Sequence, residues 1–561
     1  MPHVITQSCC GDASCVFACP VNAIQPNPGS PEFISADMLY IDPRTCVDCG
    51  ACVAACPVGA IKREDLLLES EAVFASINAE FHQGSDARPV QAQVPGLVQI
   101  ELAPKPLRIA VVGSGPAGLY AADELLKQDG VEVTLYDRLP TPYGLVRAGV
   151  APDHQHTKAI TDLFRKVEDL PGFRYVLGVE VGTDVTHDEI LEHHSAVIYA
   201  TGASKDRRLG IEGEDLVGSR TATDFVAWYN GHPDQYDADF DLSGERAVVI
   251  GNGNVALDVA RILASDPALL EQTDISDRAL EALRRSAVNE VVVLGRRGPE
   301  HAAFTLPELI GLVRRSDIDL VVNGTLPDTP PGADFTLTRK LDLLRSLPSS
   351  NTPRDTRRRI ELRFSTAPMA LRGDGCVESL DLGGTEPDPG QAGQVRATGD
   401  SSELKTSLVL RSIGYRAEPM GWLPFDSKAS VVPNDSGRVR GTNATYVVGW
   451  IKRGPSGFIG TNKTCSLETV NSLLADHNAG LLPVPRRWPA DLGSALRRKH
   501  PHAIDLSGWR HLDALEREQG VAVGRPRVKL TSRAELLGAT VDPGHSPRRR
   551  QRRRRRWPAA V

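Results

Sequence analysis

Residues 107–128 read LRIAVVGSGPAGLYAADELLKQ: an apolar run, then a glycine-rich turn, then a helix-like segment. An uninterrupted apolar run is typical of a strand buried in a parallel sheet. Gly113, Gly115 and Gly118 let the backbone approach a pyrophosphate, and the N-terminus of the following helix offers N–H groups to it. The next apolar stretch, VEVTLYD, ends at Asp137, an acid placed to receive ribose hydroxyls. Strand, helix and acid together therefore predict a dinucleotide site in an α/β fold.

A second glycine loop, GNGNVA at 251–256, lies further along the chain between the strand-like RAVVI and the helix-like LDVARILA. The strand that follows it, NEVVVLG, ends in Arg296 and Arg297 instead of an acid. Arginines at this place accommodate a 2′-phosphate, which selects NADP(H) over NAD(H). The alternative is that both arginines only lie on the surface. One site that ends on an acid and one that ends on arginines predict a flavoprotein that uses NADPH.

Upstream of both loops, one cysteine motif occurs twice, as CCGDASCVFACPVNAI at 9–24 and CVDCGACVAACPVGAI at 46–61. The spacing C-x2-C-x2-C-x3-C-P wraps thiolates around an iron–sulfur cluster, and the fourth cysteine of each run crosses to the other cluster. Zinc sites use paired C-x2-C elements instead. We expect no disulfides, because residues 1–7 have no signal-peptide pattern. The first 61 residues resemble a bacterial two-cluster ferredoxin, which carries single electrons.

The two cysteine runs differ at one ligand position, where Asp12 stands in the place of Cys49. A carboxylate oxygen is a harder ligand than a thiolate and holds iron in a sulfide cage more weakly. We therefore expect a first cluster that is 3Fe–4S or a labile 4Fe–4S, and a second that is an ordinary 4Fe–4S. Cys10 is an alternative to Cys9, although only Cys9 keeps the register of the repeat. The predicted ligands are Cys9, Cys15 and Cys56 for the first cluster, and Cys19, Cys46, Cys49 and Cys52 for the second.

The composition of the 561 residues is that of a globular protein, with 41% hydrophobic residues and a net charge of −7. The sequence has no apolar run of 18 residues, so we expect no membrane span and a cytoplasmic location. Eight arginines gather within residues 548–556. Such a run is most simply a solvated tail, and the alternative is that it binds nucleic acid or an acidic partner.

The region from about 107 to 480 closely resembles adrenodoxin reductase and its bacterial ferredoxin–NADP reductase relatives. The resemblance rests on PTPYGLVRAGVAPDHQ (140–155), VVIGNGNVALDVARIL, GRRGPEHAAFTLPEL (295–309) and VVGWIKRGPSGFIGTNK (447–463). Together with the cysteine runs, the chain resembles the ferredoxin-fused form of this reductase in actinobacteria and mycobacteria.

The resemblance implies a set of cofactor contacts. For FAD, the implied residues are Gly113, Gly115, Ala117, Asp137, Leu145, Val181, Trp450, Gly457, Phe458 and Ile459. For NADP(H), they are Arg207, Asn252, Gly253, Asn254, Val255, Arg296, Arg297, Glu308 and Gly457. His154, within APDHQ, is the candidate for a protonic group near the flavin, and a purely structural histidine is the alternative.

The fold that we expect is an α+β two-cluster ferredoxin domain followed by an α/β reductase with two dinucleotide-binding, Rossmann-like domains. Flavin takes two electrons from NADPH and can release them singly. The expected activity is therefore that of a ferredoxin–NADP+ reductase, with an external ferredoxin or another one-electron acceptor protein as partner. The alternatives are a reductase subunit like the small subunit of glutamate synthase, whose N-terminal cysteine pattern differs, and a non-enzymatic electron-carrier or scaffold module.

The composition also suggests domain boundaries. A stretch rich in glycine, proline and glutamine around residues 82–104 is typical of a linker. The expected units are a ferredoxin domain (1–65), a linker (66–105), a FAD-binding domain in two parts (106–215 and 425–482), an NADP-binding domain (216–424) and a C-terminal extension with an arginine-rich tail (483–561).

Overall fold

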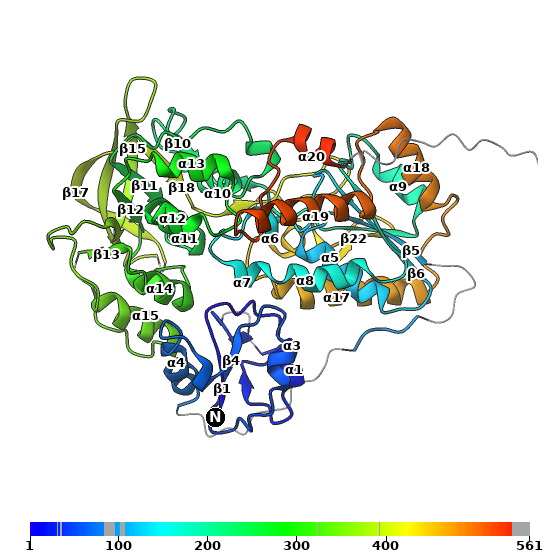
Figure 1. Ribbon diagram of the computed structural model, residues 1–561, viewed down its shortest axis with the longest axis horizontal. Helices are drawn as coiled ribbons and strands as arrows, with labels where there is room; N and C mark the ends of the chain where they lie inside the picture. The colour runs from blue at the N-terminus through cyan, green and yellow to red at the C-terminus, as the bar shows by residue number, and fades with distance from the viewer. Residues whose placement is uncertain are drawn as a thin grey trace, which may run out of the picture.

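The computed structural model describes residues 1–540 except 31, 34, 35, 84–95, 101–106, 325 and 392. A small N-terminal unit lies against a body of two lobes, and each lobe is built around a mainly parallel sheet (Figure 1). Among the described residues, none of the helices is both long enough and apolar enough to cross a membrane. The arginine run at 548–556 lies outside the described residues.

The N-terminal unit is built from the two cysteine runs. Strand β1 (His3–Ile5) pairs antiparallel with β4 (Ile61–Arg63), and β2 (Ile24–Gln25) pairs antiparallel with β3 (Tyr40–Ile41). Helices α1 (Ser14–Ala18) and α3 (Ala51–Ala55) hold equivalent places in the two runs, and each follows a residue in the left-handed region, Ala13 and Gly50. The repeat in sequence is therefore also a repeat in backbone conformation.

The expected linker begins too early at residue 66. After the 3-10 turn η1 (Glu64–Leu66), helix α4 (Val73–Phe81) packs onto β1 and β3. The buried amide of Asn78 accepts hydrogen bonds from the backbone N–H groups of Ile5 and Ile41, at 3.2 and 2.8 Å. Residues 66–82 thus belong to the ferredoxin unit, because they cover its sheet and satisfy its backbone. Much of the remaining linker lies outside the described residues.

The FAD-binding lobe contains a seven-stranded sheet in the order β20-β21-β22-β8-β5-β6-β7. All six residues of β5 are buried, as the apolar run predicts. The strands are β5 (Leu107–Val112), β6 (Val131–Asp137), β7 (Phe173–Leu177), β8 (Ala196–Tyr199), β20 (Asn434–Asp435), β21 (Arg438–Val439) and β22 (Thr445–Val447). The helices are α5 (Pro116–Leu126), α6 (Leu145–Ala148), α7 (Gln155–Lys158), α8 (Thr161–Glu168), α9 (His187–His193), α16 (Trp450–Arg453) and α17 (Thr461–Asn478). The chain leaves this sheet after β8 and returns at β20, so the lobe is discontinuous in sequence.

The NADP-binding lobe contains a six-stranded parallel sheet in the order β10-β18-β11-β12-β14-β13. Its strands are β10 (Ser219–Thr221), β11 (Arg246–Ile250), β12 (Glu290–Leu294), β13 (Ile318–Asn323), β14 (Arg358–Arg363) and β18 (Leu408–Arg411). Its helices are α10 (Ala222–Tyr229), η2 (Pro233–Gln235), α11 (Asn254–Ala264), α12 (Pro267–Leu270), α13 (Asp277–Arg284), η3 (Pro299–His301), α14 (Leu306–Val313) and α15 (Phe335–Arg345). A smaller antiparallel sheet joins β15 (Thr366–Arg372), β16 (Ser379–Pro387) and β17 (Val395–Lys405). The short pair β9 (Lys205–Asp206) and β19 (Tyr415–Arg416) lies where the chain passes between the lobes.

The C-terminal segment is part of the FAD-binding lobe and not a separate extension. It forms α18 (Pro489–Lys499), α19 (Leu506–Ala522) and α20 (Arg533–Ala539). Ile504 bridges to Leu177 of β7, and Trp509 is buried in the same apolar cluster as Tyr143. The segment therefore completes the core of this lobe, which the weak periodicity of its sequence does not reveal.

Candidate functional site

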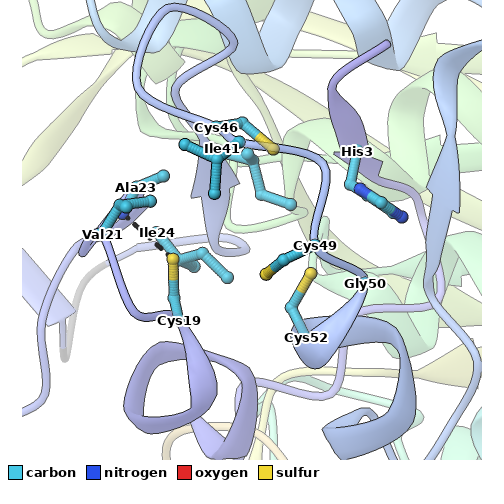
Figure 2. Close-up of a pocket in the computed structure, with 11 residues that line it drawn as sticks. His3, Cys19, Val21, Ala23, Ile24, Ile41, Cys46, Cys49, Gly50 and Cys52 are labelled. Carbon is cyan, nitrogen blue, oxygen red and sulfur yellow. Dashed lines mark hydrogen bonds between the residues drawn. The ribbon is translucent and has the colours of Figure 1, made fainter.

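Four cysteines form the predicted ligand site of the second iron–sulfur cluster, which we call the second cage. The thiols of Cys19, Cys46, Cys49 and Cys52 line a small pocket that opens to solvent, and Figure 2 shows them gathered around it. Ile24 and Ile41 supply an apolar wall. Burial, together with the neighbouring thiols of Cys19 and Cys46, raises the pKa of Cys52 to about 11. Iron must therefore displace protons when it binds, which is the usual chemistry of a thiolate site.

The predicted ligand site of the first cluster, which we call the first cage, contains Cys9, Cys15, Cys56 and Asp12. Burial, with smaller contributions from the nearby Cys56 and Asp12, raises the pKa of Cys9 to about 11. The pKa of Cys15 is also raised by burial, and its neighbours are again Cys9, Asp12 and Cys56. Cys10 lies next to the same groups, so the alternative of Cys10 as a ligand stays open. The fourth cysteine of each run lies with the other run's cage, as the ferredoxin pattern predicts.

Equivalent sulfur atoms in the two cages accept equivalent hydrogen bonds. The N–H of Ala23 donates to Cys19 Sγ and the N–H of Ala60 donates to Cys56 Sγ, both at 3.3 Å. Hydrogen bonds to cluster sulfurs are one of the features that set a reduction potential. The donor set, its apolar walls and these N–H groups together fit two iron–sulfur clusters.

The loop of the first cage is bonded to the FAD-binding lobe. The carbonyl of Cys10 accepts a hydrogen bond from the N–H of Gly460 at 2.9 Å, and a Cβ added at Gly460 would overlap the backbone of Gly11 and Asp12. Lys463 Nζ donates to Ser14 Oγ at 2.7 Å and lies 3.7 Å from the Asp12 carboxylate. Asp12 in turn accepts hydrogen bonds from the backbone and the hydroxyl of Ser14.

The first glycine loop has the close contacts that its motif requires. Gly113 has a φ of +107°, and a Cβ there would overlap the carbonyl of Ala200. The Asp137 carboxylate accepts hydrogen bonds from the N–H and the hydroxyl of Ser114, at 2.8 and 2.6 Å, so the acid lies directly beside the loop. This geometry leaves the backbone of the loop accessible to a pyrophosphate and fits a bound dinucleotide.

Several residues implied for FAD lie around this loop. Gly144, which precedes Leu145, approaches Gly115, because a Cβ at Gly144 would lie 3.0 Å from Gly115 Cα. Ser466 Oγ donates to the carbonyl of Ala117 at 2.9 Å, which brings helix α17 and the preceding 457–459 turn to the start of α5. Val181 and Trp450 pack against the apolar cluster that contains Val112 and Tyr136.

The second glycine loop opens helix α11. Gly251 has a φ of +123°, and a Cβ there would overlap the carbonyl of Ser412. Asn254 Oδ1 accepts a hydrogen bond from the N–H of Thr305 at 2.7 Å, so this residue also fixes the start of α14. Arg296 and Arg297 follow β12, and their guanidinium groups have no ion pair or hydrogen bond with any described residue. Two guanidinium groups that lie near a glycine loop and have no partner among the described residues fit the binding of a 2′-phosphate. Arg207 is exposed where the lobes join.

His154 and Glu308 meet between the lobes. Nδ1 of His154 lies 3.9 Å from Glu308 and 4.0 Å from Asp258, and its Nε2 accepts a hydrogen bond from Arg261 Nη2 at 3.0 Å. Burial raises the pKa of Glu308, although the neighbouring His154 and Arg261 oppose the shift. Burial alone would also raise the pKa of Asp153, but its ion pair with the buried Arg261 holds it well below the usual range.

Sequence reasoning missed three residues of this cluster, namely Asp153, Asp258 and Arg261. Two signals were available. Asp153 adjoins His154 in APDHQ, and Asp258 and Arg261 are spaced to share one face of the helix after the second glycine loop. Arg261 supplies the positive charge that these carboxylates need, and it links the helix of one lobe to the histidine of the other.

Comparison with known proteins covers every part of the chain described above. Residues 107–290 match the family described as pyridine nucleotide-disulphide oxidoreductase, and residues 8–60 and 38–88 match families described as 4Fe-4S dicluster domain. The chain is 50% identical over 568 residues to the probable ferredoxin/ferredoxin–NADP reductase of Mycobacterium tuberculosis H37Rv, covering 98% of this chain and 97% of the relative. It is 46% identical to the NADPH-ferredoxin reductase FprA of Mycobacterium leprae, over 76% of this chain and 97% of that protein. The solved structure of Mycobacterium tuberculosis FprA in complex with NADPH has a TM-score of 0.72 at 43% identity and covers 78% of this chain and all of its own.

Proposed function

Because the chain belongs to the family of ferredoxin/ferredoxin–NADP reductases, we propose that it moves electrons between NADPH, FAD, its own two iron–sulfur clusters and an external one-electron acceptor protein. The observation that carries this proposal is the bonding of the first cysteine cage to the segment beside the first glycine loop. Gly460 and Lys463 hold the loop at residues 10–14, and the same helix α17 contacts Ala117 at the start of α5. FAD, when bound, supplies the ability to take two electrons and release them singly.

The assignment of cofactor-binding residues is part of the proposal. Around the first loop, Gly113, Gly115 and Ala117 would lie against the FAD pyrophosphate, and Asp137 would receive the ribose. Asn252, Gly253, Asn254 and Val255 would do the same for NADP(H), with Arg296 and Arg297 on its 2′-phosphate. Leu145, Val181, Trp450 and the Gly457-Phe458-Ile459 turn would line the flavin, and Arg207 and Glu308 would border the nicotinamide nucleotide.

His154 is the residue that we propose as the protonic group of the site. It lies between the lobes, where its Nε2 accepts a hydrogen bond from Arg261 at 3.0 Å, and this contact fixes the orientation of the ring. The carboxylates of Asp258 and Glu308 approach its Nδ1 and would stabilise a proton on that atom. The arrangement would hold a proton at His154 Nδ1, between the two dinucleotide-binding lobes.

The two clusters would differ in type. Cys19, Cys46, Cys49 and Cys52 would hold a 4Fe–4S cluster, and Cys9, Cys15 and Cys56 would hold a 3Fe–4S or a labile 4Fe–4S cluster. The bonds of Asp12 to Ser14 and its proximity to Lys463 support weak ligation at best, because they engage the same carboxylate oxygens. A cytoplasmic location belongs to the proposal as well, since cage thiols need a reducing compartment.

The nucleotide assignment is tested with the double variant Arg296→Ala/Arg297→Ala. Each charge-assisted hydrogen bond to the 2′-phosphate is worth about 1.5–3 kcal/mol, so NADPH affinity should fall roughly tenfold or more per arginine. Affinity for NADH, which lacks this phosphate, should change little. Titration of flavin absorbance or of protein fluorescence with each nucleotide gives both constants.

The matched control is Arg284→Ala/Arg285→Ala, a pair of neighbouring arginines at the end of α13 in the same lobe. This control should leave both affinities unchanged. An equal loss of NADPH and NADH affinity in the Arg296/Arg297 variant would contradict the assignment of the 2′-phosphate site.

A further inference from the structure

The two cysteine cages differ in their exposure to solvent. In the first cage, Cys10, Asp12 and Cys15 are buried, and the loop that holds them is bonded to Gly460 and Lys463. In the second cage, Cys49 is exposed, and Val47, two residues before it, is 59% exposed. The second cage is therefore the more accessible of the two to a protein that approaches from solvent.

Apolar side chains are concentrated on the outer side of the ferredoxin unit. Among the described residues, fifteen large apolar side chains are exposed, and five of them belong to the first 68 residues: Met1, Val47, Val53, Leu66 and Leu68. Three segments meet there. The Met1 amine lies 3.3 Å from Asp48, and the N–H of Glu64 donates to the carbonyl of Pro2 at 3.1 Å. We call the surface formed by residues 1–2, 47–53 and 64–66 the outer face.

The ferredoxin unit is also strongly acidic, and its charge is compensated unevenly. Residues 1–82 contain ten Asp or Glu residues and only three Lys or Arg residues. On the inner side, the reductase supplies cations to three of these acids: Lys463 lies 3.7 Å from Asp12, Lys340 lies 3.6 Å from Asp37, and Arg339 lies 3.2 Å from Glu80. The other seven acids outnumber the three Lys and Arg side chains that the unit itself contains. The solvent side of the unit is therefore negatively charged.

Protein docking sites typically have an apolar centre that is surrounded by charged residues. The sign of the surrounding charge selects a partner of opposite charge. We propose that the outer face docks a separate one-electron acceptor protein whose own docking surface is cationic. The inner side uses the same principle within the chain, because there the reductase itself is the cationic partner. An acidic carrier would be repelled by the outer face. This inference rests on the proposed function, since it assumes that the second cage holds its cluster.

The test measures binding by the full-length holoprotein without NADPH. The probe is cytochrome c, a small one-electron protein with a lysine-rich surface, and affinity is measured by isothermal titration calorimetry at low ionic strength. The variant Glu64→Lys/Leu66→Lys changes both the charge and the apolar character of the outer face at exposed positions. We expect a loss of affinity of at least tenfold in this variant, and a loss for the wild type as salt is raised.

The matched control is Leu269→Lys/Glu271→Lys, which changes the same two residue types at the same spacing on helix α12 and just after it in the NADP-binding lobe. Its affinity for cytochrome c should stay within twofold of the wild type. The inference is overturned if the wild type does not bind the probe, if both variants lose affinity equally, or if an acidic plant-type ferredoxin binds more tightly than cytochrome c.

A separate measurement distinguishes this inference from the proposed function. Anaerobic NADPH should bleach the flavin absorbance of the wild type and of the outer-face variant alike, because Glu64 and Leu66 are exposed side chains of the ferredoxin unit and belong to neither glycine loop. A wild type that is not bleached would contradict the proposed function, whereas normal bleaching with unchanged probe binding in the variant would contradict only the docking surface.

Discussion

The two cysteine runs have nearly the same sequence but very different surroundings. Helices α1 and α3 begin in the same way, and Ala23 and Ala60 donate the same hydrogen bond to sulfur. Yet Asp12 is 7% exposed, while Cys49, its counterpart in the repeat, faces solvent. The difference arises from the reductase, which covers the first run and leaves the second open. The two runs therefore differ both at this ligand position and in how far the reductase covers them.

The largest expected effect comes from Gly460→Val, which should separate the first run from the reductase. The added side chain would overlap backbone atoms of Gly11 and Asp12, which cannot move aside as a flexible side chain could. Overpacking of this kind costs about 1–3 kcal/mol or more. Amide hydrogen exchange of the holoprotein should show residues 9–14 losing their protection and becoming as accessible as residues 46–52.

The control for this substitution is Gly421→Val, because Gly421 has open space around it and no positive φ. Exchange at residues 9–14 should be unchanged there. If Gly460→Val also leaves that exchange unchanged, the bonded contact between the first run and the reductase is wrong.

A second experiment exchanges the one ligand position that differs between the runs. Asp12→Cys should convert the first cluster to a stable 4Fe–4S, because a thiolate binds cluster iron better than a carboxylate. Electron paramagnetic resonance of the air-oxidised protein is the measurement, since an oxidised 3Fe–4S cluster has an odd-electron signal and an oxidised low-potential 4Fe–4S cluster has none. The wild-type signal should disappear in the variant.

The reciprocal variant, Cys49→Asp, tests the equivalent ligand position in the second run. It should make the second cluster lose iron on oxidation and add a second odd-electron signal. A silent wild-type protein with both clusters fully loaded would mean that Asp12 is an adequate ligand or that Cys10 has taken its place.

The smallest expected effect is that of Lys463→Met, which removes one hydrogen bond to Ser14 and one ion pair with Asp12. A single partly exposed contact of this kind is worth about 1 kcal/mol, or roughly a fivefold change in an equilibrium constant. Hydrogen exchange at residues 9–14 should therefore accelerate about fivefold. Lys62→Met, which breaks the pair with Glu71 inside the ferredoxin unit, should leave this segment unaffected. A larger effect of Lys62→Met would argue against the interdomain role of Lys463.

Spacing and chemical type were enough to predict much of this protein. The cysteine spacing and the two glycine loops predicted the fold class, and the resemblance of four longer stretches predicted the family. The 50% identity over nearly the whole chain confirms the family and the reductase function. These features are readable because each depends on a few neighbouring residues whose geometry is set locally. The individual cofactor contacts and the type of the first cluster stay predictions.

Local sequence was enough to predict candidate residues for iron and nucleotide, because ligand spacing and glycine conformation are properties of short segments. How those segments are arranged in space followed only from the fold. It placed residues 66–82 in the ferredoxin unit, brought Trp509 into the core of the FAD-binding lobe, and joined His154 to Arg261 across the lobes. It also buried Asp12 beside Lys463, 451 residues later in the chain. Such contacts depend on packing between distant segments, and no local pattern encodes them.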